Sequence, residues 1–361
     1  MCIRDSQLYS TDRAEAKTYA DLFRFLNSGF AVLVLEGASS ALVFGIQGYD
    51  KRSVSEPSGE DNVMGAKDGF IEVVRVNMSL LRRRMKTPQL KLELFVKGTK
   101  SQTDLCLCYM ADRVPKQLIR EIKVRLDEME LESILSSGYL QPFLENRRSC
   151  LFDTVGTTQR PDVLCAKLLE GRVGLLIEGT PFALVIPKLF CESFQTMDDY
   201  CYRPAYATLV RWIKYAAFLV AILLPALYVA IALHHPELLN RTLLLILAEA
   251  EENAPISLTA EAIGVLLVYE IIREAGLRLP KAVGGAVSIV AGLIIGDAAV
   301  SSGLISTPML TVTAIAVIAG FVVPDLAQSI TLLRLAFLLT AGVLGLFGIS
   351  LLGAVVLFNL C

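Results

Sequence analysis

Tyr215–Leu233 reads YAAFLVAILLPALYVAIAL, a run of nineteen residues without a formally charged side chain. A helix needs about 20 apolar residues to cross a hydrocarbon core of ~30 Å. It can cross because a helix satisfies its own backbone hydrogen bonds, which lipid cannot do. Only five of the 34 Lys and Arg residues lie at or beyond Tyr215. The run therefore predicts a soluble region followed by a membrane region.

The composition of the two regions differs in the same way. Hydrophobic residues make up 54% of the chain, above the roughly 45–50% of ordinary soluble domains. Residues 1–214 hold 29 basic and 27 acidic side chains, whereas residues 215–361 hold 5 and 9. Neither balance is the basic excess typical of a nucleic-acid-binding domain, so we expect no nucleic-acid partner. The eight cysteines include no Cys-x-x-Cys pair, which favours a reducing compartment for the soluble region.

Further apolar runs predict a helical transmembrane bundle over residues 205–361, with about five spans near 215–233, 255–272, 282–305, 308–323 and 335–360. Arg203, Arg211 and Lys214 precede the first span, and the loop HHPE at 234–237 follows it. By the positive-inside rule, the soluble region then lies in the cytoplasm. Leu243–Ala248 is too short to cross, so we expect it at the interface or as a re-entrant piece.

The soluble region carries helix and strand patterns in two cycles, which predict two small α/β subdomains at residues 8–112 and 113–204. The predicted elements are an amphipathic segment at Tyr19–Asn27, a hairpin from Ala31–Leu35 and Ala41–Ile46, a loop at Lys51–Gly69, helices at Asp68–Met85, Pro115–Leu135 and Arg160–Leu169, and strands at Leu90–Val96, Leu105–Met110, Val173–Ile177 and Phe182–Ile186. Cys106 and Cys108 are two apart in a strand pattern, so we expect both to face one side and to be buried. The whole chain is thus expected to be α+β in its first part and all-α in its second.

Motifs for catalysis or cofactor binding are missing from the sequence. The segment Gly59–Lys67 resembles a phosphate-binding loop only superficially, because its spacing is wrong and no apolar strand leads into it. The only histidines, His234 and His235, follow the first span directly. They supply neither a Ser/His/Asp triad nor a multi-histidine metal site. The sequence therefore predicts no enzyme activity, no cofactor and no metal site.

The second predicted span contains acidic residues. An ionisable group at membrane depth costs at least ~2.5–3.5 kcal/mol and normally faces protein or water. Glu261 and Glu270 are nine residues apart, about 180° around a helix, so they cannot share one narrow face. Glu270 and Arg273 are i,i+3 neighbours and can form an ion pair. Two interpretations stay open: helix-end snorkelling plus one internal ion pair, or a Glu261 that faces a water-filled path for ions.

The third predicted span carries Asp297 within Gly292-Leu-Ile-Ile-Gly296-Asp297. Ser288, Gly292 and Gly296 form a small-xxx-small ridge, which lets helices approach closely. An acid beside such a ridge indicates either a polar contact between subunits or a charge facing a pore. In both cases we expect neighbouring copies of the chain to enclose the acids away from lipid.

Both ends of the chain differ from their surroundings. Met1–Ser6, MCIRDS, fits neither a signal peptide nor the domain that follows, and we interpret it as a cloning or assembly scar. Leu357–Cys361 ends inside an apolar run without a polar tail. From these patterns we expect a fragment at both ends.

Four stretches of the sequence together resemble one protein family. They are Arg160-Pro161-Asp162 with the nearby Leu168-Leu-Glu170-Gly171-Arg; Gly179-Thr-Pro with Pro187 and Phe190; Asp198-Asp-Tyr with Arg203-Pro204; and Glu270-Ile-Ile-Arg273-Glu274-Ala-Gly-Leu-Arg278-Leu-Pro280. The segment Gly292–Ser306 continues the match. With these motifs, most of residues 40–355 resembles the A subunit of the GerA-type spore germination receptors.

That resemblance implies a multi-pass protein of the spore inner membrane. It also implies a transporter-like B subunit and a lipoprotein C subunit as partners. A nutrient bound to the B subunit would open an ion path in a homo-oligomer of A subunits and start germination by cation release. Glu261, Glu270 and Asp297 are then the candidates for the path.

Two other functions remain open. A non-conducting signalling scaffold would use its soluble region to bind a partner and its helices only as an anchor, so Arg160-Pro161-Asp162 would matter more than the membrane acids. A secondary transporter is the weaker alternative, because the predicted spans show no inverted repeat of broken helices.

Overall fold

The structure is a computed structural model, which describes residues 13–45, 50–57, 59–60, 62, 65–145, 150–252, 256–279, 296 and 298–360. The chain forms two compact units. The first, called the sheet unit here, comprises Met1–Asp61, Ala66–Leu144 and Val155–Pro187. The second, the helical unit, comprises Asn62–Gly65, Glu145–Thr154 and Lys188–Cys361.

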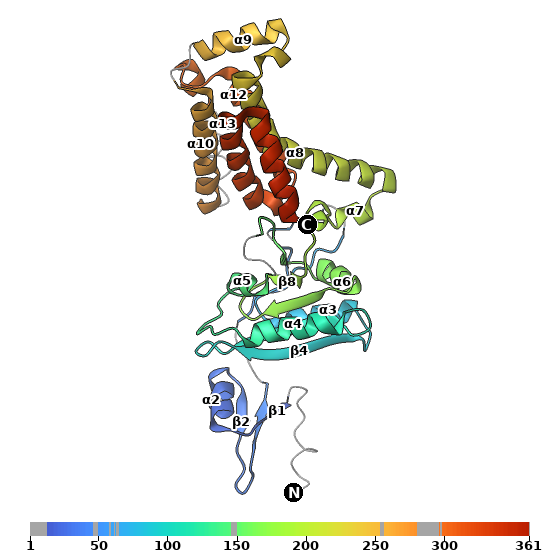
Figure 1. The fold of residues 1–361 in the computed structure, drawn as a ribbon. Helices are drawn as coiled ribbons and strands as arrows, with labels where there is room; N and C mark the ends of the chain where they lie inside the picture. Colours follow the sequence, from blue (N-terminus) through green and yellow to red (C-terminus); the bar gives the residue numbers. More distant parts are fainter. Residues whose placement is uncertain are drawn as a thin grey trace. The chain divides into compact units, whose positions relative to one another are not determined.

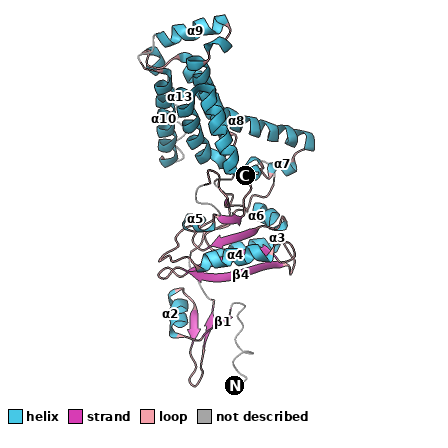
Figure 2. Cartoon of the chain, viewed as in Figure 1, coloured by secondary structure: helices cyan, strands magenta, loops and turns pink. Residues whose placement is uncertain are grey.

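The sheet unit contains a five-stranded antiparallel sheet (Figure 2). Its spatial order is β4 (Leu90–Lys97), β5 (Thr103–Met110), β7 (Val173–Ile177), β8 (Ala183–Ile186) and β6 (Gly156–Thr158). The predicted strands therefore form, and the turn between β7 and β8 contains Gly179 with φ 86°. Such a positive φ favours glycine, which has no Cβ to clash.

One sheet crosses the predicted boundary between the two subdomains. Strand β5 pairs with β7, with Leu105 opposite Ile177 and Tyr109 opposite Val173. The division drawn between residues 112 and 113 thus runs through a single sheet. The cycles of the sequence pattern are local, whereas strand pairing joins segments about 70 residues apart in the chain.

Helices cover both faces of this sheet (Figure 1). Cys106 and Cys108 point to the face packed by α3 (Val74–Arg84) and α6 (Pro161–Leu169), and both are buried as expected. Leu105 and Leu107 point to the opposite face, packed by α4 (Lys116–Asp127) and α5 (Gln141–Leu144). The alternation of the strand places successive residues on opposite faces, so β5 contributes to two hydrophobic cores.

A smaller element group precedes the main sheet. Strands β1 (Arg13–Ala16), β3 (Ala41–Phe44) and β2 (Ala31–Leu33) form a three-stranded antiparallel sheet. Helix α2 (Tyr19–Asn27) lies against it, and its N-terminus is closed by reciprocal hydrogen bonds between Thr18 and Asp21. The predicted hairpin and amphipathic segment are confirmed here.

Two predicted helices are shorter than their apolar patterns indicate. Helix α3 begins at Val74 instead of Asp68, because the Asn77 side chain binds both the N–H (2.9 Å) and the C=O (2.6 Å) of Ile71. These bonds hold Ile71 outside the helix. Helix α4 ends at Asp127, well before Leu135. Lys100 N–H then donates to the carbonyl of Glu132, which ties the following segment to the loop between β4 and β5.

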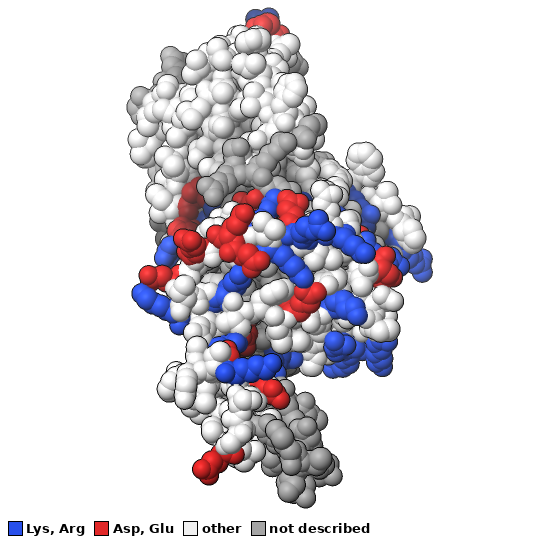
Figure 3. Space-filling view, turned by 60° about the horizontal axis from the view of Figure 1, so that its bottom comes forward, with Lys and Arg blue, Asp and Glu red and all other residues white. Residues whose placement is uncertain are grey.

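The helical unit consists of short helices followed by long apolar ones. Its elements include η2 (Phe190–Phe194), α7 (Asp198–Cys201), α8 (Pro204–His234), η3 (Pro236–Leu238), α9 (Arg241–Glu252), α10 (Leu258–Arg278), α12 (Thr307–Phe321), η4 (Pro324–Leu326) and α13 (Ala327–Leu360). Figure 3 shows Lys, Arg, Asp and Glu crowded over the sheet unit, whereas the visible face of the helical unit is almost uncharged. An uncharged helical surface is what lipid requires.

By length and composition alone, two helical segments among the described residues, Pro204–His234 and Pro324–Leu360, are long and apolar enough to cross a bilayer. The first contains the predicted span 215–233. Helix α12 corresponds to the predicted span 308–323 but has only 15 residues. Helix α10 begins at Leu258 and continues past residue 272 to Arg278. Most of the predicted span 282–305 lies outside the described residues, so five spans stay a prediction.

Helix α13 folds back on itself at Gly345. The Ser329 hydroxyl donates to the Leu151 carbonyl (2.7 Å), and the Leu151 N–H donates to Oδ1 of Asn359 (3.0 Å). In a straight helix, Ser329 and Asn359 would lie about 45 Å apart. Gly345 has φ 60° and ψ −143°, which reverses the chain. The segment 335–360 is therefore not one continuous helix, because two antiparallel arms, 327–344 and 346–360, form this part of the chain (Figure 1). A membrane crossing by this segment stays a prediction.

Candidate functional site

Glu261 lies in the first turn of α10 and is only 3% exposed. Its Oε1 accepts hydrogen bonds from the N–H (2.6 Å) and the hydroxyl (2.7 Å) of Ser306, the N-cap of α12. Two helix N-termini thus meet this carboxylate, and their partial positive charges favour an anion. Its Oε2 is buried and has no hydrogen-bond partner among the described residues. The described part of one chain is therefore enough to bury Glu261, and no neighbouring copy is needed for that.

Glu270 lies near the other end of α10 and forms the predicted ion pair. Arg273 Nη2 lies 2.6 Å from Glu270 Oε2, and the Thr331 hydroxyl donates to Glu270 Oε1 at 3.0 Å. Glu261 contacts α12 and Glu270 contacts α13, so the two acids do not share a site. This separation is what nine residues of helix impose.

Most of the glycine ridge and the acid of the third predicted span, namely Ser288, Gly292 and Asp297, lie outside the described residues. Pro280, the last residue of the family stretch before that span, lies outside them as well. Gly296 is described, and a Cβ added there would lie 3.9 Å from the Leu310 side chain. This is an ordinary van der Waals distance, so the described surroundings of Gly296 do not demand a glycine.

Arg334 is a buried charge whose role is not apparent from the sequence pattern. It lies in the first arm of α13 and is 4% exposed. Its Nε donates to the Ala221 carbonyl at 2.8 Å, and its Nη2 to the Ala316 carbonyl at 3.3 Å. One side chain thereby connects α13 with α8 and α12.

A proline in α8 leaves the Ala221 carbonyl without its usual helical donor. In a helix the Ala221 carbonyl would accept from the N–H four residues later, but that residue is Pro225, which has no N–H. Arg334 replaces the missing donor. Gly320 leaves room for the guanidinium, because a Cβ there would lie 3.2 Å from Arg334 Nη2. The sequence signal that could have revealed this contact is Pro225, four residues after Ala221, together with Arg334 as a single arginine in an apolar run.

The Arg160-Pro161-Asp162 motif forms a buried cluster at the start of α6. Arg160 is 3% exposed, and its Nε and Nη2 contact Asp162 at 3.1 and 2.7 Å. Arg160 Nη2 also donates to the Ala66 carbonyl at 2.9 Å. Pro161 occupies the first turn, where its missing N–H has no cost. The motif therefore attaches the backbone carbonyls of Glu60 and Ala66 to the N-terminus of α6.

The Glu170-Gly171 motif ends the same helix. The Gly171 N–H donates to the Leu168 carbonyl and the Arg172 N–H to the Lys167 carbonyl, which is a Schellman motif. Gly171 has φ 87°, and an added Cβ would lie 3.2 Å from the Arg113 carbonyl oxygen. Glu170 is the C-cap and pairs with Lys167 at 3.2 Å on the surface. Both motifs of the sheet unit thus have local structural roles.

A further ion-pair cluster joins α7 to the start of α8. The Asp199 side chain is 1% exposed and lies 3.1 Å from Arg211 Nε and 3.2 Å from Lys214 Nζ. The Thr196 hydroxyl also donates to Asp199 at 3.1 Å. Burial by itself raises the pKa of Asp199, but hydrogen bonds from Lys214 and Arg211 outweigh it and lower that pKa below its ordinary value.

The family stretch that begins at Glu270 and includes Arg273, Glu274 and Arg278 lies on α10 itself. Arg273, Glu274 and Arg278 are all within the helix, whereas the predicted span ended before them. Glu274 and Arg278 form an exposed i,i+4 pair at 2.6 Å. The helix continues because each charge finds a partner one turn away or on α13.

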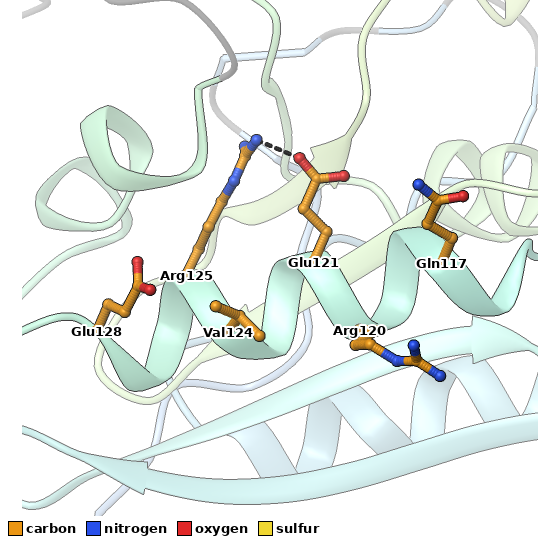
Figure 4. A pocket seen from close by; sticks show the side chains of 6 residues that line it. All are labelled: Gln117, Arg120, Glu121, Val124, Arg125 and Glu128. Carbon is orange, nitrogen blue, oxygen red and sulfur yellow. Dashed lines mark hydrogen bonds and ion pairs between the residues drawn. The ribbon is translucent and has the colours of Figure 1, made fainter.

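A surface hollow of the sheet unit lies over the outer face of α4 (Figure 4). Its lining residues all come from this one helix: Gln117, Arg120, Glu121, Val124, Arg125 and Glu128. Arg125 and Glu121 form an i,i+4 ion pair. Mixed charges on one helix face are typical of a solvated surface, so the hollow does not define a site.

Within the described residues, no group of three or more His, Cys, Asp and Glu is placed to hold a metal ion. The charged clusters just described connect helices, loops and helix ends. Together with the long apolar helices, they define a membrane-associated protein with an α/β unit and a helical unit, whose interior charges act through contacts between elements.

The chain belongs to the GerA family, described as Bacillus/Clostridium GerA spore germination protein, which it matches over residues 2–361. It is 38% identical to spore germination protein KA of Bacillus subtilis, over 96% of this chain and 64% of that protein. It is 32% identical to spore germination protein GerLA of Bacillus cereus, over 92% and 68%. The resemblance to GerA-type A subunits is therefore confirmed.

Two further similarities complete the comparison. The uncharacterized membrane protein YfkQ of Bacillus subtilis is 38% identical, over 92% of this chain and 65% of that protein. The crystal structure of the N-terminal domain of the A subunit of the Bacillus megaterium spore germinant receptor GerK3 is 32% identical, with a TM-score of 0.29, over 50% of this chain and 64% of that one. The chain thus spans somewhat less than two thirds of the length of the first relatives.

Proposed function

We propose that this chain is the A subunit of a nutrient-sensing spore germination receptor, and that copies of it form a germinant-gated path for cations. The observation that carries the germination role is the family match over residues 2–361, whose relatives are named spore germination proteins. In this proposal the protein lies in the spore inner membrane, with its sheet unit in the cytoplasm. A transporter-like B subunit binds the nutrient, and a lipoprotein C subunit completes the receptor.

Glu261 supports the cation path. A carboxylate in an apolar helical unit is costly and is normally kept for a function. One of its oxygens holds Ser306, and the other has no partner among the described residues. A free carboxylate oxygen attracts cations and repels anions. Asp297 is the second acid of the proposed path, whereas Glu270 is occupied by Arg273.

The test is conductance of the reconstituted protein in planar bilayers with and without its partners. We expect Glu261→Gln to reduce cation conductance about tenfold or more, because it removes a unit charge from a poorly solvated site. Glutamine keeps an acceptor for Ser306, so the contact between α10 and α12 survives. Glu274→Gln is the matched control, since Glu274 lies on the same helix in an exposed pair. Unchanged conductance and selectivity in Glu261→Gln and Asp297→Asn would remove both residues from the path.

A non-conducting signalling scaffold is the second candidate. The observation that favours it is the buried contact between Arg160 and Asp162, because Arg160 also holds the Ala66 carbonyl at the N-terminus of α6. If the backbone around Ala66 is part of the partner surface, Asp162→Asn abolishes germination while conductance and membrane insertion persist. Loss of conductance in the same variant would instead favour the channel.

A further inference from the structure

A second polar site lies inside the helical unit, separate from Glu261. It is a cavity of about 110 Å³ bordered by α10, α12 and α13. Its polar lining comes from Tyr269, Glu270, Arg273, Thr331 and Arg334, and its remaining walls are mainly apolar. A water molecule takes up about 30 Å³ in the liquid, so the cavity has room for a small polyatomic group.

The charges around this cavity do not balance. Glu270 and Arg273 neutralise each other, at a distance of 2.6 Å. Arg334 is 4% exposed, and no carboxylate of the described residues forms an ion pair with it. Its partners are the two backbone carbonyls of Ala221 and Ala316. The described lining therefore carries one net positive charge.

Two guanidinium N–H groups at the cavity also lack acceptors. Arg334 Nη1 and Arg273 Nε are buried and have no hydrogen-bond partner within the described residues. Burying a charged donor without an acceptor is costly, and proteins rarely leave one so. The Thr331 hydroxyl contacts both Glu270 and Arg273. Arg273 on α10 and Arg334 on α13 therefore line the same cavity from two helices.

We propose that this cavity binds a singly charged phosphate group, with Arg334 and Arg273 as its donors. Guanidinium groups match the geometry of phosphate oxygens and form charge-assisted hydrogen bonds with them. One negative charge balances the excess charge of the lining. The phosphate comes either from an anionic lipid or from free phosphate in solution. The proposal does not depend on ion conduction by the protein.

The test uses the full chain in detergent and follows its thermal unfolding midpoint. Sodium phosphate replaces sodium chloride at constant ionic strength, and a parallel series adds phosphatidylglycerol or phosphatidylcholine. A ligand that binds only the folded state raises the midpoint in a saturable way. A rise with phosphate identifies free phosphate as the ligand. A rise only with phosphatidylglycerol identifies the lipid.

Three variants separate binding from folding. Arg273→Gln leaves the contacts of Arg334 with Ala221 and Ala316 in place and should weaken binding about tenfold or more, as expected for a lost charge-assisted bond. Glu270→Gln adds a second net positive charge and frees Arg273, so it should bind phosphate more tightly than the unaltered chain. Impaired folding cannot produce that gain. Arg278→Gln, on the exposed end of α10, should change nothing.

Two results would overturn the proposal. One is the absence of any saturable rise with phosphate or with either lipid. The other is a rise that is the same in the unaltered chain, Arg273→Gln and Glu270→Gln, because binding would then occur elsewhere.

Discussion

At the scale of single residues, buried charges connect the elements of this protein. Arg160 holds a loop, Arg334 holds two helices, and Asp199 holds the start of α8. Each is nearly inaccessible to solvent, so each must keep its partner to be tolerated. The cost of breaking such a contact follows from the charge that remains unpaired.

Asp199 provides a prediction for stability. Asp199→Asn leaves Lys214 buried without its carboxylate, and we expect a loss of about 3 kcal/mol in the free energy of unfolding. We use the lower end of the range for buried pairs, because Arg211 is 35% exposed. Chemical denaturation of the full chain in detergent measures this loss in the free energy of unfolding. Asp325→Asn, which breaks an exposed pair with Lys188, should cost less than about 1 kcal/mol.

The same residue predicts a pH dependence. The pKa of Asp199 is lowered in the folded protein. Its contribution to the free energy of unfolding is therefore fully present above the unfolded pKa of about 3.9, and it is lost as the pH falls through the folded pKa. Below about pH 4, we therefore expect the stability of the unaltered chain to fall more steeply than that of Asp199→Asn. Parallel curves of unfolding free energy against pH would contradict this.

At the scale of elements, the reversal in α13 depends on one glycine. Gly345 has φ 60° and ψ −143°, a conformation that is nearly restricted to glycine. A Cβ added there would lie 2.9 Å from the His234 Cβ at the end of α8. The reversal also brings Gly348 against the Thr340 carbonyl, where an added Cβ would lie 2.5 Å from the oxygen. The fold-back thus packs the two arms closely near the turn.

Gly345→Ala should therefore destabilise the helical unit by at least about 1–3 kcal/mol or open the hairpin. Spin labels at the exposed positions Leu332 and Phe358, in a background without other cysteines, report the distance between the arms. We expect a short distance in the hairpin, against about 39 Å for a straight helix. Gly353→Ala is the control, since a Cβ there meets nothing within 4 Å. A long distance in the unaltered chain would refute the fold-back.

At the scale of the whole molecule, the exposed cysteines offer a test of topology. Cys191 and Cys201 are exposed and precede α8, whereas Cys106, Cys108 and Cys165 are buried. Burial raises the pKa of Cys165 to about 11, which further lowers its reactivity. If the region before α8 is cytoplasmic, a membrane-impermeant maleimide should label the protein only after protoplasts are lysed. Labelling in intact protoplasts that disappears in Cys191→Ser/Cys201→Ser would place this region outside.

Much of the local structure was predictable, and the sites were predictable only in part. The hairpins, the amphipathic segment at 19–27 and the pair of Glu270 with Arg273 follow from spacings of a few residues. The contact of Glu261 with Ser306 was not predictable, because its partner lies 45 residues away. The role of Arg334 was missed for the same reason: its acceptors lie on two other helices.

The sequence by itself determined the apolar run at 215–233, the division into a charged and an apolar region, and the family of the protein. These properties depend on composition, period and motif, which are local. Only the tertiary structure decided that β5 and β7 share a sheet, that α13 reverses at Gly345, and that Arg334 replaces the donor missing at Pro225. Strand pairing, chain reversal and buried hydrogen bonds all depend on which distant segments come into contact. A local sequence pattern does not identify the distant segment that a residue will contact.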